Sequence, residues 1–254
     1  MCGIIAILRQ PSNRLVPSTE EIIGCVVDAV GLVNSNDTSA LGEAAEKFEL
    51  ANSLLSGVSG LLALQRDPEL SQKLVDLLDD IDFEFHITEN QSTNFGEGIE
   101  NANVFLVRIR DAVWALLHDR VGGYNGVCSL ASKSHPPSEA GLAVLLSVQQ
   151  ALSAIDRLEV RGRDSAGIQV TIWDHDLQDI SESEPCFNDP LYRSGSMRLL
   201  PSGEILLVAK VASEIGELGD NTQTLRRILT TNSLLEKALA SPAVQGAVLG
   251  HTRW

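Results

Sequence analysis

The sequence has little positive charge and no long apolar run, and each shortage excludes a class of protein. It holds 19 Lys and Arg residues against 34 Asp and Glu residues, which gives a net charge of −15. A surface of this sign repels the phosphate backbone, so we expect no nucleic-acid partner. No segment approaches the roughly 20 consecutive apolar residues that a membrane-spanning helix needs, so we expect no membrane partner either.

Cysteines are few and scattered. The four are Cys2, Cys25, Cys128 and Cys186, and none of them forms a CxxC pair. Neither a zinc site nor a disulfide framework is supported, so we predict no metal and no cofactor. The first residues lack the charged region and the long apolar stretch of a secretory signal. We therefore expect a soluble, cytoplasmic protein.

The spacing of apolar residues predicts a mixed α/β protein. The continuous apolar run 3–8 predicts a strand that is buried on both faces. Ser18 and Glu21 form a capping box, which predicts a helix start there. Further helices are expected over 42–65, 68–81, 99–118, 142–158 and 222–239, and further strands over 166–173, 204–211 and 247–254. Residues 174–203 are rich in turn formers and are expected to form a loop or hairpin rim.

A boundary is predicted between residues 121 and 138. This stretch contains Gly122-Gly123, Asn125-Gly126 and Pro136-Pro137, which are turn and helix-breaker signals. The helical segment 11–137 therefore separates strand 3–8 from the later elements. We expect it to be an insertion.

Cys2 is a candidate nucleophile. Methionine is normally removed when the next side chain is small, so Cys2 would become the N-terminal residue with a free amine. Such an amine has a pKa of about 7.7 to 8.0 in model compounds, which suits a general base near neutral pH. One residue would then supply both the thiol nucleophile and its base. Taken alone, this passage fits better with Cys2 as a small apolar residue that begins a strand.

Two further passages carry polar side chains at the ends of predicted strands. Residues 161–167 place two arginines, an aspartate and two glycines between a helix and a strand, which is typical of a tight polar turn. Residues 250–254 end an apolar strand with Arg253, whose guanidinium suits bidentate binding of a carboxylate. Each passage alone is also compatible with a purely structural turn or a solvated strand end.

Taken together and in order, Met-Cys-Gly-Ile at the start, Arg-Gly-Arg-Asp-Ser-Ala-Gly at 161–167 and His-Thr-Arg-Trp at 251–254 resemble class II, or Ntn-type, glutamine amidotransferases. Within that family they most resemble the glutaminase domain of glutamine–fructose-6-phosphate aminotransferases. The resemblance covers residues 1–10 and 138–254, and leaves 11–137 as the insertion. It implies an α/β/β/α sandwich, of which this chain supplies a part.

The resemblance also implies roles for individual residues. Cys2 would attack the side-chain amide of L-glutamine and form a thioester. Arg161 and Gly162 would pack against the N-terminus and fix it. Arg253 would bind the α-carboxylate of glutamine beside Thr252, and Trp254 would begin a mobile loop over it. The ammonia would pass to a C-terminal synthase domain, which makes an amino sugar phosphate.

The sequence also departs from the family pattern. Arg163 stands where the aminotransferases usually have Tyr. The Asn-Gly pair of the family's oxyanion hole follows the Arg-Trp motif, so we expect it after Trp254 and expect this chain alone to be inactive. Asn125 and Gly126 precede the turn motif and cannot take that role.

Two other functions stay open. One is an enzyme similar to amidophosphoribosyltransferase, although the equivalent strand of that family ends in Arg-Tyr rather than Arg-Trp. The other is a non-catalytic regulatory or assembly module, in which the insertion makes the contacts. The oligomeric state, a homo-oligomer included, is not readable from the sequence.

Overall fold

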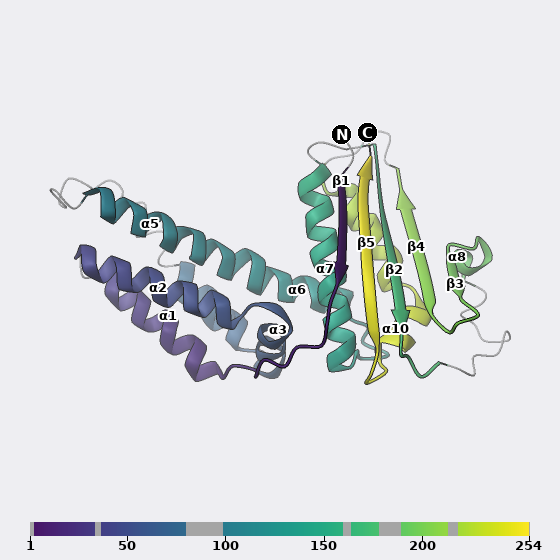
Figure 1. Cartoon of the computed structure of the whole chain (residues 1–254), viewed down its shortest axis with the longest axis horizontal. Helices are drawn as coiled ribbons and strands as arrows, with labels where there is room; N and C mark the ends of the chain where they lie inside the picture. Colours follow the sequence, from purple (N-terminus) through teal and green to yellow (C-terminus); the bar gives the residue numbers. More distant parts are fainter. Residues whose placement is uncertain are drawn as a thin grey trace. The chain divides into compact units, whose positions relative to one another are not determined.

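The computed structural model describes residues 3–33, 37–79, 99–159, 164–177, 189–212 and 218–253. The chain forms two compact units (Figure 1). One comprises Met1–Pro11 with Gly126–Trp254, and the other is Ser12–Asn125. The first holds an antiparallel sheet with helices, and the described part of the second is helical, so the predicted α/β class is confirmed. Residues 126–137, which the sequence assigns to the insertion, belong to the sheet unit.

The helical unit packs its apolar helix faces around a common core. Ser18 Oγ accepts a hydrogen bond from the backbone N–H of Glu21 at 3.1 Å, which confirms the predicted helix start. Phe48 is fully buried at the centre of the core, together with Ile22, Leu74 and Ile109. The helices are α1 (Thr19–Val33), α2 (Thr38–Leu54), α3 (Gly57–Arg66), a segment over 70–79, α5 (Ile99–Trp114) and the π-helical η3 (Ala115–Val121).

Two predictions for the helical segment are wrong. The single helix expected over 42–65 is divided, because α2 ends at Leu54 and α3 begins at Gly57, whose φ of 67° lies in the left-handed region. The glycines at 122 and 123 do not break the chain, since α6 (Gly122–Leu130) follows η3 directly. Val127 and Leu130 of α6 are buried, and this burial outweighs the cost of about 1 kcal/mol for each helical glycine.

Five strands of the other unit form one antiparallel sheet in the order β1-β5-β2-β4-β3. They are β1 (Gly3–Leu8), β2 (Ser165–Trp173), β3 (Met197–Leu199), β4 (Ile205–Val211) and β5 (Gln245–Arg253). The strands predicted at 3–8, 166–173, 204–211 and 247–254 are thereby confirmed to within two residues at each end. β3 and the short α8 (Pro190–Arg193) lie inside the range 174–203, which the sequence assigns to a loop or hairpin rim.

Helices cover one face of this sheet. α7 (Glu139–Glu159) packs on β1, β5 and β2, while α9 (Asp220–Thr230) packs on β2 and β4 (Figure 1). The predicted helix 222–239 is divided into α9 and α10 (Ser233–Leu239), because the Asn232 side chain accepts from the backbone N–H of Leu235 at 2.8 Å and begins a new helix.

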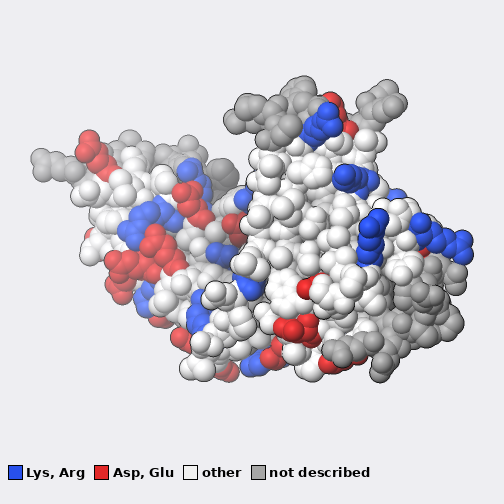
Figure 2. Space-filling model, turned by 45° about the vertical axis from the view of Figure 1, so that its right-hand side comes forward, with Lys and Arg blue, Asp and Glu red and all other residues white. Residues whose placement is uncertain are grey.

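The opposite face of the sheet is not covered by these helices. Ile4 and Leu8 are 74% and 73% exposed, whereas the alternate residues of β1 are partly buried. The prediction that this strand is buried on both faces is therefore wrong, because β1 is an edge strand with helices on one side only. Leu249 of β5 is exposed on the same face as Ile4, Ala6 and Leu8. Figure 2 shows mostly uncharged residues over the visible surface of this unit.

No helix within the described ranges combines the length and the apolar character that crossing a bilayer requires.

Phe48→Ala is expected to destabilise the helical unit by about 3 to 5 kcal/mol, because it removes a large aromatic side chain from a fully buried position. Urea unfolding of the whole chain, followed by helical circular dichroism, measures this change. The matched control is Leu50→Ala on the same helix, where the side chain is 51% exposed. Equal losses for the two variants would contradict the placement of the core.

Candidate active site

Three passages that are far apart in the sequence meet at one end of the sheet. β5 lies between β1 and β2 and pairs antiparallel with both strands, so its last residues lie beside the first residues of its two neighbours. In this register Thr252 is opposite Gly3 on one side and opposite Ala166 on the other. The first residues of β1 and β2 and the His-Thr-Arg segment of β5 therefore lie at the same end of the sheet (Figure 1).

Thr252 fixes the beginning of β1. Its side chain is 1% exposed, and its hydroxyl accepts a hydrogen bond from the backbone N–H of Gly3 at 3.3 Å. A Cβ atom at position 3 would lie 2.7 Å from Leu158 Cδ1 and 3.1 Å from Thr252 Oγ1. A larger residue at position 3 would require the Leu158 side chain to move. The backbone that directly follows Cys2 is thus held from two sides.

The start of β2 is tied to the end of β5. Ser165 is opposite Arg253 in the register, and the backbone N–H of Asp164 donates to the Arg253 carbonyl at 3.1 Å. Arg161 and Gly162 precede Asp164 in the sequence by three and two positions.

His251 lies over Gly167 on the face that the helices leave open. A Cβ atom at position 167 would lie 2.3 Å from His251 Cε1, so the imidazole occupies the space that a larger residue would need. No role was predicted for His251. The signal was present in the motif, because a glycine directly opposite a bulky residue in paired strands indicates close packing.

The last turn of α7 carries a buried carboxylate near the same end of the sheet. Glu159 is 1% exposed, and its Oε2 accepts from the backbone N–H of Gly219 at 2.8 Å, just before α9. Asp156, one turn earlier, accepts from the Thr222 hydroxyl at 2.7 Å. Among the described residues, no donor reaches Glu159 Oε1. Sequence analysis missed Glu159, since no local pattern indicates that it is buried.

The predicted site residues are described only in part. Cys2, Arg161, Gly162 and Trp254 lie outside the described residues. Thr252 and Arg253 are described and lie at the strand end given above. Arg253 is exposed, and its side chain has no ion pair or hydrogen bond with any residue that the structure describes. Its guanidinium is therefore open to a carboxylate.

Two other cysteines are described, and both have free thiols. Burial raises the pKa of the Cys25 thiol above its usual value, which lowers the fraction present as the reactive thiolate. Cys128 is exposed on α6, which is not part of the sheet.

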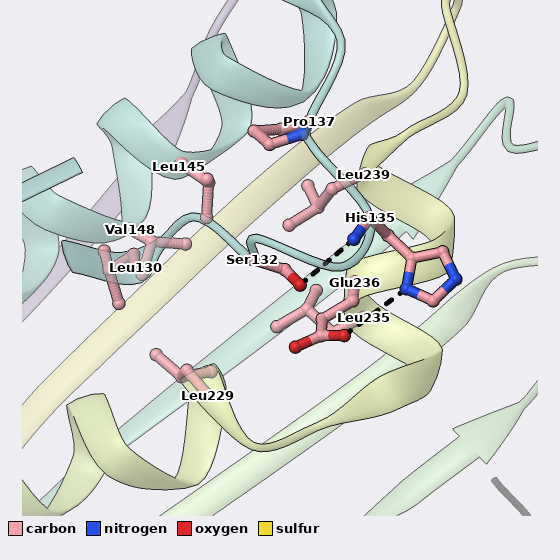
Figure 3. A pocket seen from close by; sticks show the side chains of 10 residues that line it. All are labelled: Leu130, Ser132, His135, Pro137, Leu145, Val148, Leu229, Leu235, Glu236 and Leu239. Carbon is pink, nitrogen blue, oxygen red and sulfur yellow. Dashed lines mark hydrogen bonds and ion pairs between the residues drawn. The ribbon is translucent and has the colours of Figure 1, made fainter. Parts of the chain in front are cut away.

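A small apolar pocket lies among α6, α7, α9 and α10 (Figure 3). Leucine, valine and proline side chains line most of it, and its volume of about 10 Å³ holds roughly one water molecule. At its edge His135 Nδ1 lies 3.6 Å from Glu236 Oε2, and the Ser132 hydroxyl accepts from the His135 backbone N–H at 3.3 Å. We interpret this pocket as a packing gap, because it is too small for a substrate.

In the part of the chain that the structure describes, no group of three or more His, Cys, Asp or Glu side chains is arranged to hold a metal ion. The sequence matches no protein-family model, and comparisons with curated proteins and with solved structures return no match.

Thr252→Val is expected to lower the free energy of unfolding of the sheet unit by about 1 kcal/mol, because the Gly3 N–H loses its acceptor at a buried position. Faster hydrogen exchange of the Gly3 amide, measured by NMR, should accompany the loss. Thr252→Ser keeps the hydroxyl and is the matched control for the hydrogen bond. If the amide exchanges equally fast in both variants, the hydroxyl is not its acceptor.

Proposed function

We propose that the sheet unit is the glutaminase part of a class II glutamine amidotransferase, with Cys2 as its N-terminal nucleophile. The observation that carries the proposal is the meeting of Gly3, Ser165 and Thr252 at one end of the sheet. Each of these residues belongs to one of the three motifs that resemble the family. A reaction that uses all three motifs requires them to be close together in space.

The proposed reaction needs a nucleophile, a base and a carboxylate binder. The Cys2 thiol attacks the carbonyl carbon of the glutamine side-chain amide, while the α-amine of Cys2 accepts the thiol proton. That proton passes to the leaving nitrogen, the C–N bond breaks, and ammonia departs from a γ-glutamyl thioester. Water then attacks the thioester, and glutamate leaves with the thiol restored.

Arg253 is the proposed binder for the α-carboxylate of glutamine. Its exposed guanidinium follows directly on Thr252, whose hydroxyl holds the backbone next to the nucleophile. Substrate binding and nucleophile positioning would then depend on two successive residues of one strand. Arg161 and Gly162, which precede Asp164 in the sequence, would fix the N-terminus, as the family resemblance implies.

The uncovered face of the sheet supports the finer fold assignment. Ile4, Leu8 and Leu249 expose large apolar side chains on one face, and a contiguous apolar surface of this kind usually meets a partner. We propose that a second sheet of the same domain packs on this face. That would make the Ntn-type α/β/β/α sandwich.

The remaining parts of the proposal rest on the sequence resemblance. The acceptor of the ammonia would be a sugar phosphate, bound by a C-terminal synthase domain, and the enzyme would act in the cytoplasm without a metal or other cofactor. Arg163 stands where the aminotransferases usually have Tyr, so the acceptor has to be identified by experiment.

A glutamine analogue with an electrophilic group in place of the amide should label the full-length protein at Cys2, and peptide mass spectrometry locates the label. Cys2→Ala should abolish the labelling. Because the N-terminal amine must be unprotonated to act as the base, labelling should rise with pH towards about 8. Retention of Met1 in the native protein, or labelling that persists in Cys2→Ala, would contradict the proposal.

Arg253→Gln should raise the analogue concentration needed for half-maximal labelling by about 10- to 100-fold, because a charge-assisted contact to the α-carboxylate is lost. Arg198→Gln, on β3 at the far edge of the sheet, is the matched control and should leave this concentration unchanged. The same effect from both substitutions would rule out a specific role for Arg253.

A further inference from the structure

The outer face of α5 carries apolar side chains that the core of the helical unit does not use. Leu106, Ile109 and Val113 of this helix are buried, whereas Val104 and Val107 are 58% and 46% exposed. Successive residues of an α-helix are about 100° apart, so Val107 points nearly opposite to Ile109. The exposed face of a surface helix is normally polar, so packing within the unit does not account for the two valines.

An aromatic pair continues the same face towards η3. Residues seven positions apart lie on nearly the same side of a helix, so Trp114 follows Val107 two turns later. Trp114 is 47% exposed, and its indole stacks on the His118 imidazole with the ring centroids 4.7 Å apart and an interplanar angle of 11°. His118 Nδ1 donates to the Trp114 carbonyl at 3.1 Å, which holds the imidazole against the indole. An aromatic side chain that is already ordered loses little entropy when a partner binds.

Val104, Val107, Trp114 and His118 together form a surface that we call the α5 stripe. At 1.5 Å per helical residue it is about 20 Å long. Single exposed apolar residues are common on soluble proteins, but several along one helix face indicate an interaction site. Tryptophan is also among the residues that contribute most to binding at protein interfaces.

The unit that carries the α5 stripe is strongly acidic. The segment Ser12–Asn125 holds seven Lys and Arg residues against 19 Asp and Glu residues, a net charge of −12 out of the −15 of the whole chain. Beside the stripe, Arg108 donates to the two carboxylate oxygens of Glu49 at 2.8 and 2.7 Å. These hydrogen bonds, with the nearby charges of Glu49 and Glu46, raise the pKa of the Arg108 guanidinium above its usual value. Carboxylates therefore outnumber the guanidinium group on this flank.

The combination of an apolar stripe and an acidic unit favours one kind of partner. A second copy of the chain would bring two acidic units together, and their mutual repulsion opposes that pairing. A basic amphipathic helix would place its apolar side chains on the stripe and its Lys or Arg side chains beside the flanking carboxylates. Because the stripe is about 20 Å long, it matches roughly four turns of such a helix.

We propose that the α5 stripe is a docking surface for a basic amphipathic helix of a partner protein. Trp114 is the central contact, and Val104 and Val107 extend the apolar surface towards the beginning of α5. The proposal does not depend on the glutaminase reaction, because none of these residues belongs to the sheet unit.

Titration of the full chain with a helical peptide of leucine and lysine, about 18 residues long and with leucines along one face, tests this docking. The chain is labelled with fluorotryptophan and followed by ¹⁹F NMR. The Trp114 signal should shift saturably, while the signal of Trp173 in the sheet unit should not move. A peptide with the same leucines and with glutamate in place of lysine should leave both signals unchanged.

The double substitution Val104→Ser with Val107→Ser should weaken binding of the lysine peptide by about tenfold or more, because the apolar surface is lost. Val27→Ser on α1 is the matched control, since this valine is 49% exposed on another helix, and it should bind as the wild type does. All the substituted side chains are largely exposed, so helical circular dichroism should stay the same and separate lost binding from lost folding.

Four outcomes would overturn the proposal. The lysine peptide could leave the Trp114 signal unmoved, or the double variant could bind it as tightly as the wild type, which would mean attraction by charge alone. The glutamate peptide could bind equally well, which would mean that no basic partner is preferred. Sedimentation equilibrium could also show that the chain alone dimerises and that the double variant is a monomer, in which case a second copy occupies the stripe.

Discussion

The pairing of β5 with β1 and β2 at the same time is the constraint on which the sheet unit depends. Gly3 and Thr252 are 249 positions apart in the sequence, yet the Thr252 hydroxyl and the Gly3 amide form one hydrogen bond. The same residue of β5 pairs with Ala166 of β2. Without this double pairing β1 has no partner among the described strands, and the three motifs have no common edge.

Close packing between α7 and the sheet fixes the register of this pairing. Gly3 approaches Leu158, Gly250 approaches Ile155, and a Cβ atom at either position would come within 3 Å of the helix side chain. Interiors packed at this density leave little room for a strand to slip. A shift of β1 by one residue would turn Ile5 and Ile7 away from α7, so burial and register support one another.

The sequence predicted the helices and strands better than the packing around them. Strand 3–8 and helix 142–158 were found because their apolar patterns are long and regular, and the capping box at Ser18 is a local signal. The exposure of Ile4 and Leu8 could not be predicted, because a continuous apolar run does not reveal that the strand lies at an edge. The burial of Glu159 and His175 and the packing of His251 could not be predicted either, because their surroundings come from residues distant in the sequence. Among the predicted site residues, Thr252 and Arg253 have a described position, and their motif was recognised by its order along the chain.

The position of β1 at both the beginning of the chain and the edge of the sheet affects how the protein folds. The helical unit makes its contacts within one continuous segment, so it can fold early. β1 cannot pair until β5, which lies far along the sequence, has been made. Long-range strand pairing closes a large loop and is intrinsically slow. During synthesis β1 therefore leaves the ribosome long before β5 exists, and its apolar residues stay exposed to chaperones or to non-native partners until β5 is made.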